Sequence, residues 1–414
     1  MHDVGSFARR TASRWGFALA ALLAAASAPA QVQRTFVNLG FELPDAGASR
    51  CYFQVAESAV PGWTTNHGIR AGAACAPNIA LTTGPLIEIW SNAFNGVTAR
   101  HGKQFAELNA EEASRIYQNV CLANGEPIGW RFSHRGRQAG RADEYDKTEL
   151  RIGTVPSTNR VMLAATRTDG AAGTPVCFGS SSPDGGVSGN ACTHAAAPGG
   201  WRDYSGQFTW TGPTGVQAIG FEAIEAVGGN TIGNFIDDIQ MTLRPFVELT
   251  TATASVREGS PGGLPMLRVV GTVPAGGITV TLAIDGGSAT RGSDYTTASG
   301  NDTLSVVVPA GVYDGSNFAL PLTMSDDAAI EDNETITLAI TSSPTNYVLS
   351  STRTCGAAPI TATTITLRDN DVDLAASLDA PTSARAGGPL VYVATYTNHA
   401  AAPSGAEASS RDVT

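Results

Sequence analysis

Two acidic segments bounded by strand-like sequence constrain the fold of this chain most. Residues 325–334 (SDDAAIEDNE) hold five carboxylates, and residues 368–371 (RDND) follow later in the chain. The flanking runs NFALPLTM, ETITLAITSS and TATTITL are rich in Thr, Ile and Leu with near alternation, which predicts strands. The carboxylates should therefore gather at strand ends, where they repel one another unless a cation lies among them. Ca²⁺, which takes roughly six to eight oxygen ligands, is the usual solution.

Composition favours an all-β, multi-domain protein. The chain has 414 residues with 46 Gly and 22 Pro, and almost no stretch shows sustained helical periodicity. This length is ample for two or more separate cores. The formal net charge of -11 argues against nucleic acid as a partner.

The first thirty residues predict export. Arg9, Arg10 and Arg14 precede the apolar run GFALAALLAAASA, and a small-x-small cleavage pattern follows at residues 28–30. We interpret residues 1–30 as a secretory signal peptide, because the apolar run is too short to span a bilayer. No later segment predicts a membrane helix. We therefore expect an exported protein.

The six cysteines all follow this segment, and an export compartment permits disulfides among them. Six cysteines allow fifteen pairings, which the sequence does not rank rigorously. We favour two local pairs, Cys51 with Cys75 and Cys177 with Cys192. Cys121 and Cys355 are expected to be free thiols, since they fall in different units. No CxxC motif or His/Cys cluster indicates zinc.

Residues 31–244 are expected to form the first unit. Short alternating strands separated by Gly, Pro, Asn and Ser predict a double-sheet jelly roll. The motifs NLGFE, VPGW, IEIW, FAELN and FIDDI occur in this order. The order resembles the galactose-binding-like jelly-roll modules of bacterial secreted proteins and some plant cell-wall proteins. This resemblance implies carbohydrate binding and a structural Ca²⁺ near the ends of the unit, with Glu42 and Asp238 (or Asp237) as its ligands.

Sugar sites commonly use exposed aromatic faces beside polar groups. All five tryptophans that follow the signal segment lie in the first unit. Trp90, with Glu88 and Arg70 close by, is the candidate ligand-binding set. The alternative is that tryptophans in alternating strands belong to the core.

Residues 246–372 are expected to form the second unit. Seven strand-like runs separated by turn residues predict an immunoglobulin-like sandwich. Five arginines face thirteen Asp and Glu residues here, so much of the acidity of the chain is concentrated in this unit.

The segments VREG, GSDY, SDDAAIEDNETITLAI and TITLRDND occur in this unit in this order. Their order and spacing resemble a Calx-beta domain, a calcium-binding repeat of sodium/calcium exchangers and of many bacterial surface proteins. The resemblance implies Ca²⁺ ligands at Glu258, Asp294, Asp327, Glu331, Glu334, Asp369 and Asp371, with the backbone carbonyl of Ala329. Ala328 and Asn370 stand where the family has acids, which implies fewer or weaker ions. The alternative is that these acids are solvated charges that protect strand edges.

Residues 373–414 change character again. The segments DLA and GGPLVYVATYTN resemble the opening of a small β-sandwich repeat found in tandem on bacterial envelopes. About forty residues supply too few strands to bury a core. We expect an incomplete β-sandwich repeat or a linker.

No GxSxG, HExxH, P-loop or dinucleotide motif is found, so we expect no enzyme. Taken together, the sequence predicts a non-catalytic protein, extracellular or at the cell surface of a bacterium. In it a calcium-binding spacer would hold a glycan-binding adhesion module, with glycans or other cell-surface proteins as further partners. One alternative is a structural stalk without ligand. Another is a polysaccharide-active enzyme that uses a carboxylate pair such as Glu88 and Glu107.

Overall fold

The computed structural model describes residues 32–156, 159–179, 187–260, 262–343, 345–371 and 374–398. The predicted signal peptide and the last part of the chain lie outside these residues. The all-β class is confirmed, because the described elements are strands apart from two 3₁₀ turns of three residues each, η1 (Glu57–Ala59) and η2 (Pro198–Gly200). No described helix is long and apolar enough to cross a membrane.

The first sandwich packs a nine-stranded sheet against a six-stranded sheet. The nine-stranded sheet runs in the order β12 (Val187–Ala196), β13 (Arg202–Trp210), β8 (Pro127–Arg135), β15 (Phe235–Thr242), β6 (Gln104–Glu107), β5 (Thr83–Ser91), β1 (Tyr52–Ala56) and β4 (Ala73–Ala74), with β3 (Ile69–Ala71) paired to β5. The six-stranded sheet runs in the order β11 (Val176–Cys177), β10 (Asn159–Thr166), β9 (Asp146–Gly153), β14 (Gly215–Glu225), β7 (Arg115–Leu122) and β2 (Thr64–Thr65).

Strand alternation builds the core between these sheets. In β8, for example, every second side chain from Ile128 through Trp130 and Phe132 is buried. Successive side chains of a strand point to opposite faces, so this period of two commits one face of each sheet to the interior. All five tryptophans of the unit are buried as well: Trp63, Trp90, Trp130, Trp201 and Trp210.

The second sandwich contains a four-stranded and a five-stranded sheet, with a short two-stranded ladder beside them. The four-stranded sheet runs in the order β22 (Gly311–Ala319), β18 (Met266–Val273), β16 (Phe246–Leu249) and β25 (Val348–Leu349). The five-stranded sheet runs in the order β17 (Thr253–Arg257), β26 (Ala362–Arg368), β24 (Glu334–Ile340), β19 (Ile278–Gly287) and β21 (Thr303–Val308). The ladder joins β20 (Tyr295–Thr297) to β23 (Leu322–Met324). A separate cluster of Val, Leu and Ile side chains fills this sandwich.

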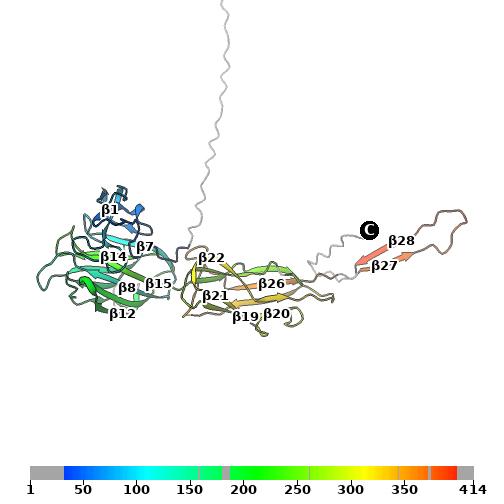
Figure 1. The fold of residues 1–414 in the computed structure, drawn as a ribbon. Coiled ribbons are helices and arrows are strands. Elements are labelled where there is room, and N and C mark those ends of the chain that lie inside the picture. The colour runs from blue at the N-terminus through cyan, green and yellow to red at the C-terminus, as the bar shows by residue number, and fades with distance from the viewer. Residues whose placement is uncertain are drawn as a thin grey trace, which may run out of the picture.

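The two sandwiches lie end to end (Figure 1), and the chain passes directly from β15 of the first to β16 of the second. Arg34 lies at this junction and pairs with the carboxylate of Glu126, both side chains being almost fully buried. Its guanidinium donates to the carbonyls of Cys121 and Arg244 and stacks on the ring of Phe246 at 3.9 Å. We call this set of contacts the Arg34 clasp. It leaves no room for a side chain at residue 271, because a Cβ there would lie 2.8 Å from Arg34 Cγ. The φ of residue 271 is +114°. The position therefore favours glycine.

A disulfide joins Cys121 of the first sandwich to Cys355 of the second. The expectation that these two cysteines are free thiols is therefore wrong. Their sequence separation of 234 hid the pairing, because strand β7 and the segment before β26 meet only at the junction. The structure also joins Cys51 to Cys75 and Cys177 to Cys192, the two local pairs that the sequence favoured.

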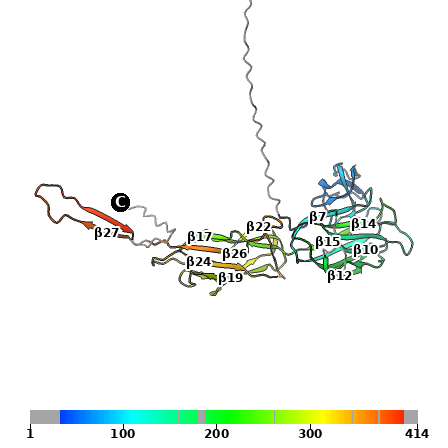
Figure 2. The same cartoon turned by 180° about the vertical axis from the view of Figure 1, so that it is seen from behind.

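Beyond the second sandwich the chain forms a two-stranded antiparallel hairpin of β27 (Leu374–Asp379) and β28 (Val393–Asn398). The hairpin extends away from the end of the second sandwich that lies opposite the first (Figures 1 and 2). Leu378, Val391 and Tyr392 are more than half exposed in it. Two strands are too few to bury a core of their own.

Candidate metal site

Strand pairing brings the two acidic segments together at the hairpin end of the second sandwich. β17 runs parallel to β26 with Arg257 opposite Arg368, so Glu258 and Asp369 leave the sheet side by side. β24 runs antiparallel to β26 with Glu334 opposite Leu367, which places the start of β24 at the same end. Asp294 precedes β20 and is tied to this end by Ser325, whose amide donates to the Asp294 carbonyl at 2.9 Å.

Six of the predicted ligands form two groups of three. One group contains Glu258, Asp369 and Asp371, and the other contains Asp294, Glu331 and Glu334. Within each group, one carboxylate oxygen of every residue lies within 4.8 Å of the others. Such spacing lets three oxygens contact one ion.

Several oxygens in these groups lack a partner. Glu258 Oε2, Glu334 Oε2 and Asp371 Oδ2 are buried and accept no hydrogen bond. Among the described residues of the second sandwich, Arg291 pairs with Asp302, and no described ion pair includes any of the six carboxylates. Buried oxygens without donors are costly unless a cation contacts them. The all-oxygen donor set fits a hard cation such as Ca²⁺.

Backbone amides order the acidic run around the groups. Asp369 Oδ2 accepts a hydrogen bond from the amide of Glu331 at 2.9 Å. Asp369 Oδ1 accepts another from the amide of Asp371 at 2.8 Å. Asp327 Oδ1 accepts one from the amide of Ala329 at 2.7 Å, so both residues lie in the same exposed loop. Neither Asp327 nor the Ala329 carbonyl belongs to the two groups of three.

Asn370 has a role that the sequence did not suggest. Its side-chain amide donates to Asp326 Oδ1 at 2.8 Å and so links the two acidic segments. The sequence comparison treated Asn370 only as a lost acid. An amide at this position removes one negative charge and adds a donor, which holds the Asp326 carboxylate near the site.

Burial and mutual repulsion shift the titration of these carboxyls. Burial, followed by the charges of Asp369 and Glu331, raises the pKa of Glu258 to about 7. Burial and contact with Asp294 raise the pKa of Glu334 to about 7. Both groups thus bind protons more tightly in the folded, ion-free chain than at the ordinary value of 4.5.

This shift predicts an inverted pH dependence in the absence of calcium. A carboxyl whose folded pKa is raised contributes stability below about pH 4.5 that is lost as the pH rises through about 7. In chelator, the melting temperature of the second sandwich should therefore fall between pH 4.5 and pH 7. Differential scanning calorimetry at stepped pH measures it.

The matched control is the double variant Glu258→Gln, Glu334→Gln, whose neutral amides cannot titrate. The melting temperature of this variant should change less with pH over this range. Burial also raises the pKa of Asp237 to about 7, and the difference between the two proteins isolates Glu258 and Glu334 from that group. Equal slopes in both proteins would show that the two carboxyls titrate normally.

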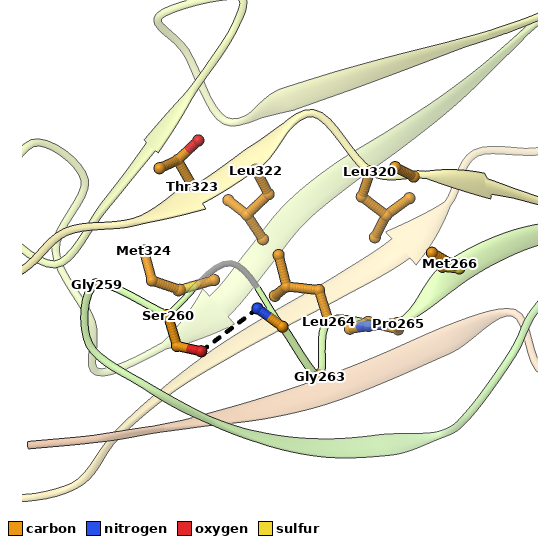
Figure 3. A pocket seen from close by; sticks show the side chains of 12 residues that line it. Gly259, Ser260, Gly263, Leu264, Pro265, Met266, Leu320, Leu322, Thr323 and Met324 are labelled. Carbon is orange, nitrogen blue, oxygen red and sulfur yellow. Dashed lines mark hydrogen bonds between the residues drawn. The ribbon is translucent and has the colours of Figure 1, made fainter.

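An apolar pocket adjoins the acidic end (Figure 3). After the last β18–β22 pair, Met266 with Ala319, the two segments separate and enclose a cavity of about 330 Å³. Leu264, Leu322 and Met324 line it (Figure 3). None of the six carboxylates lines this pocket, so the oxygen groups lie beside it rather than in it.

Each residue of the second predicted metal site, in the first sandwich, has protein partners in the structure. Glu42 Oε1 accepts hydrogen bonds from the amides of Lys103 and Gln104 at 2.9 and 3.2 Å. Asp237, the alternative ligand, is buried and accepts from the amide of His101 at 2.9 Å. Asp238 instead pairs with Arg131 at 2.8 Å, so its carboxylate is already neutralised.

The predicted sugar site at Trp90 is wrong. Trp90 is 2% exposed, and its indole donates to Glu88 Oε1 at 2.6 Å inside the core. Arg70 lies on the surface, 3.4 Å from Glu112. Trp90 lies on the face of β5 opposite Ile87 and Ile89, which point into the core between the sheets. It is buried there in a smaller cluster, packed on Phe94 and Phe235, and the alternation of the strand gives no sign of this second covered face.

Glu88 and Glu107 lie opposite each other on β5 and β6 and are also buried. Glu107 accepts two hydrogen bonds from Arg137, and Glu88 accepts one from Gln54 at 2.7 Å. Burial raises the pKa of both carboxyls. Both carboxylates are therefore out of reach of a polysaccharide in this structure.

Comparisons with known proteins add little. No protein-family model matches the chain, and no curated protein matches its sequence. Among solved structures, the adhesin domain of Epf from Streptococcus pyogenes aligns at 9% identity over 82% of this chain and 98% of that chain, with a TM-score of 0.23. This likeness is too small to bear on function.

Proposed function

We propose that this chain is an exported, non-catalytic surface protein whose second sandwich binds Ca²⁺ and acts as a rigid spacer. One observation carries the proposal. Two groups of three carboxylates meet at one end of the sandwich, and three of their buried oxygens have no hydrogen-bond donor. A bound dication would supply the missing partner and offset the repulsion.

Calcium is favoured over other cations by the donor set. The ligands are carboxylates on loops and strand ends rather than His or Cys, which argues against zinc. Carboxylates carried by several separated segments suit the larger, variable coordination shell of Ca²⁺ better than the strict octahedron of Mg²⁺. The resemblance of this unit to Calx-beta domains agrees with the same ion.

The spacer role follows from where the ion would lie. The described chain resumes at Leu374 in the hairpin, shortly after Asp371. One ion held by Glu258 and Asp371 and a second held by Asp294 and Glu334 would tie the segments of the acidic end together at the exit of the sandwich. The three disulfides agree with export, since such bonds persist in oxidising compartments. Adhesion to glycans or to other surface proteins would then be the task of the neighbouring modules.

A thermal melt with and without calcium tests the proposal. At a hundredfold excess over the dissociation constant, the ion should stabilise the folded state by about 2.7 kcal/mol. Glu334→Ala should remove most of this increment, because it deletes one ligand and its buried oxygen. Asp332→Ala, an exposed acid of the same run outside both groups, is the matched control and should keep the calcium response.

Isothermal titration of the same proteins with Ca²⁺ and Mg²⁺ separates binding from stability. Heat of binding with Ca²⁺ that Glu334→Ala loses and Asp332→Ala retains is the expected result. A full calcium response in Glu334→Ala would mean that the ion lies elsewhere. No response in the unmodified protein would leave the acids as solvated charges and favour a stalk without ligand.

A further inference from the structure

A cavity lies in the seam between the two sandwiches. It has a volume of about 380 Å³, within the range of roughly 300–1,000 Å³ that is common for small-molecule sites. Phe36 and Met241 of the first sandwich form one wall, and Pro274 and Ile278 of the second form the other. Interfaces between domains are preferred places for ligand sites.

The two walls of the cavity are fixed relative to each other in the absence of a ligand. The Cys121–Cys355 disulfide joins the sandwiches covalently. The Arg34 clasp adds a buried ion pair and hydrogen bonds to the Arg244 carbonyl at 3.0 and 2.9 Å. A cavity with fixed walls needs little ordering when a ligand binds, which favours affinity.

Arg244 supplies an unused positive charge. It lines the seam cavity and also a second cavity of about 510 Å³. Its half-buried guanidinium makes no ion pair or hydrogen bond within the described chain, whereas its carbonyl is used by Arg34. Glu126, the acid that acts on Arg244 electrostatically, already gives both oxygens to Arg34. A guanidinium without a protein partner can bind a ligand carboxylate through two parallel hydrogen bonds.

The rest of the lining is neutral and mixed. The side chains of Thr242, Thr272 and Asn346 make no hydrogen bond within the described residues, so their hydroxyls and amide are available to a ligand. The half-buried ring of Phe36 adds an apolar face. Hydroxyl partners beside an aromatic face suit a polyhydroxylated ring.

We propose that the seam cavity binds a carboxylate-bearing sugar, such as a uronic acid unit of an acidic polysaccharide. Arg244 holds the carboxylate, and Thr272 and Asn346 hydrogen-bond the ring hydroxyls. The site goes beyond the calcium-binding spacer and does not depend on it, since the acidic groups lie at the opposite end of the second sandwich.

Titration of the full chain with three probes tests the site. D-glucuronate carries both the ring and the carboxylate, D-glucose carries only the ring, and L-glutamate carries a carboxylate without the ring. Glucuronate should bind more tightly than either. Each titration is run with calcium and with chelator, and equal results in both keep this test separate from the calcium proposal.

Two variants locate the binding. Arg244→Gln should weaken glucuronate at least tenfold, in line with the loss of a charge-assisted pair. Arg385→Gln makes the same charge change on the exposed hairpin and should leave the affinity unchanged. Asn346→Ala, at an exposed side chain, should weaken glucuronate and glucose alike and keeps the test valid if Arg244→Gln fails to fold.

Three results would overturn the proposal. The first is no binding of glucuronate. The second is equal affinity for glutamate, which would make the cavity a general carboxylate site suited to acidic peptides. The third is unchanged glucuronate affinity in both folded variants, which would place the sugar elsewhere.

Discussion

Replacing Cys121 and Cys355 together by alanine should lower the free energy of unfolding by on the order of 5 kcal/mol. The disulfide closes a loop with a sequence separation of 234, and the chain-entropy account assigns larger effects to longer loops. Cys121 also packs in a small cluster with Val32, Phe246 and Val270, so its loss leaves space there. Urea unfolding followed by far-ultraviolet circular dichroism, which reports on the strands of both sandwiches, measures the change.

The local pair Cys51–Cys75 provides the control. Its separation is 24, so the double alanine variant there should cost only about 3 kcal/mol. Removal of the long-range disulfide should also split unfolding into two transitions, because the two hydrophobic clusters are otherwise separate. Equal losses for both pairs, with a single transition throughout, would show that the noncovalent contacts alone couple the sandwiches.

Arg34→Ala should destabilise the junction by about 3–5 kcal/mol, the range for removing one partner of a buried ion pair. The change leaves the Glu126 carboxylate almost fully buried without its cation. It also removes the stacking on Phe246 and two donors to the Arg244 carbonyl. The variant should unfold at lower urea concentration, and calorimetry should show its unfolding transition shifted toward lower temperature.

A double variant distinguishes the effect of an unpaired Glu126 carboxylate from the effect of lost packing. Arg34→Met with Glu126→Gln removes both charges, and the glutamine oxygen can still accept the hydrogen bond from the Ala123 amide. This pair should recover much of the loss, because well-packed neutral replacements of buried ion pairs are often near neutral. If the double variant is as unstable as Arg34→Ala, packing rather than charge dominates at this position.

The strands and the gathering of acids were within reach of sequence reasoning because both depend on local pattern. Alternation marks a strand, and an acid directly after a strand lies at the edge of a sheet. Glu258 and Asp369 meet because β17 and β26 run parallel, so the residues that follow the two strands lie at the same end of the sheet.

The junction and the burial of Trp90 were beyond that reasoning for a physical reason. Cys121, Cys355 and Arg34 meet only after both sandwiches have formed, and their separation in sequence gives no local signal. Trp90 lies on the face of β5 that points away from the opposing sheet, and it is buried because Phe94 and Trp201 cover that face. The alternation of β5 carries no signal of that cover. Arg34 resembled any surface arginine until Glu126 and Phe246 were placed around it.

The Cys121–Cys355 bond also determines how the protein would respond to tension. A pull between residue 32 and residue 371 is carried from Cys121 directly to Cys355, so the intervening chain bears no load while the bond is intact. Strands from β8 to β25 lie inside that covalent loop, including most of both cores. Only residues 32–51, 75–121 and 355–371 can lengthen, at up to about 3.6 Å per residue, because the Cys51–Cys75 bond in the same way bypasses the residues between its cysteines. Under force the two sandwiches would behave as a tether of limited extension.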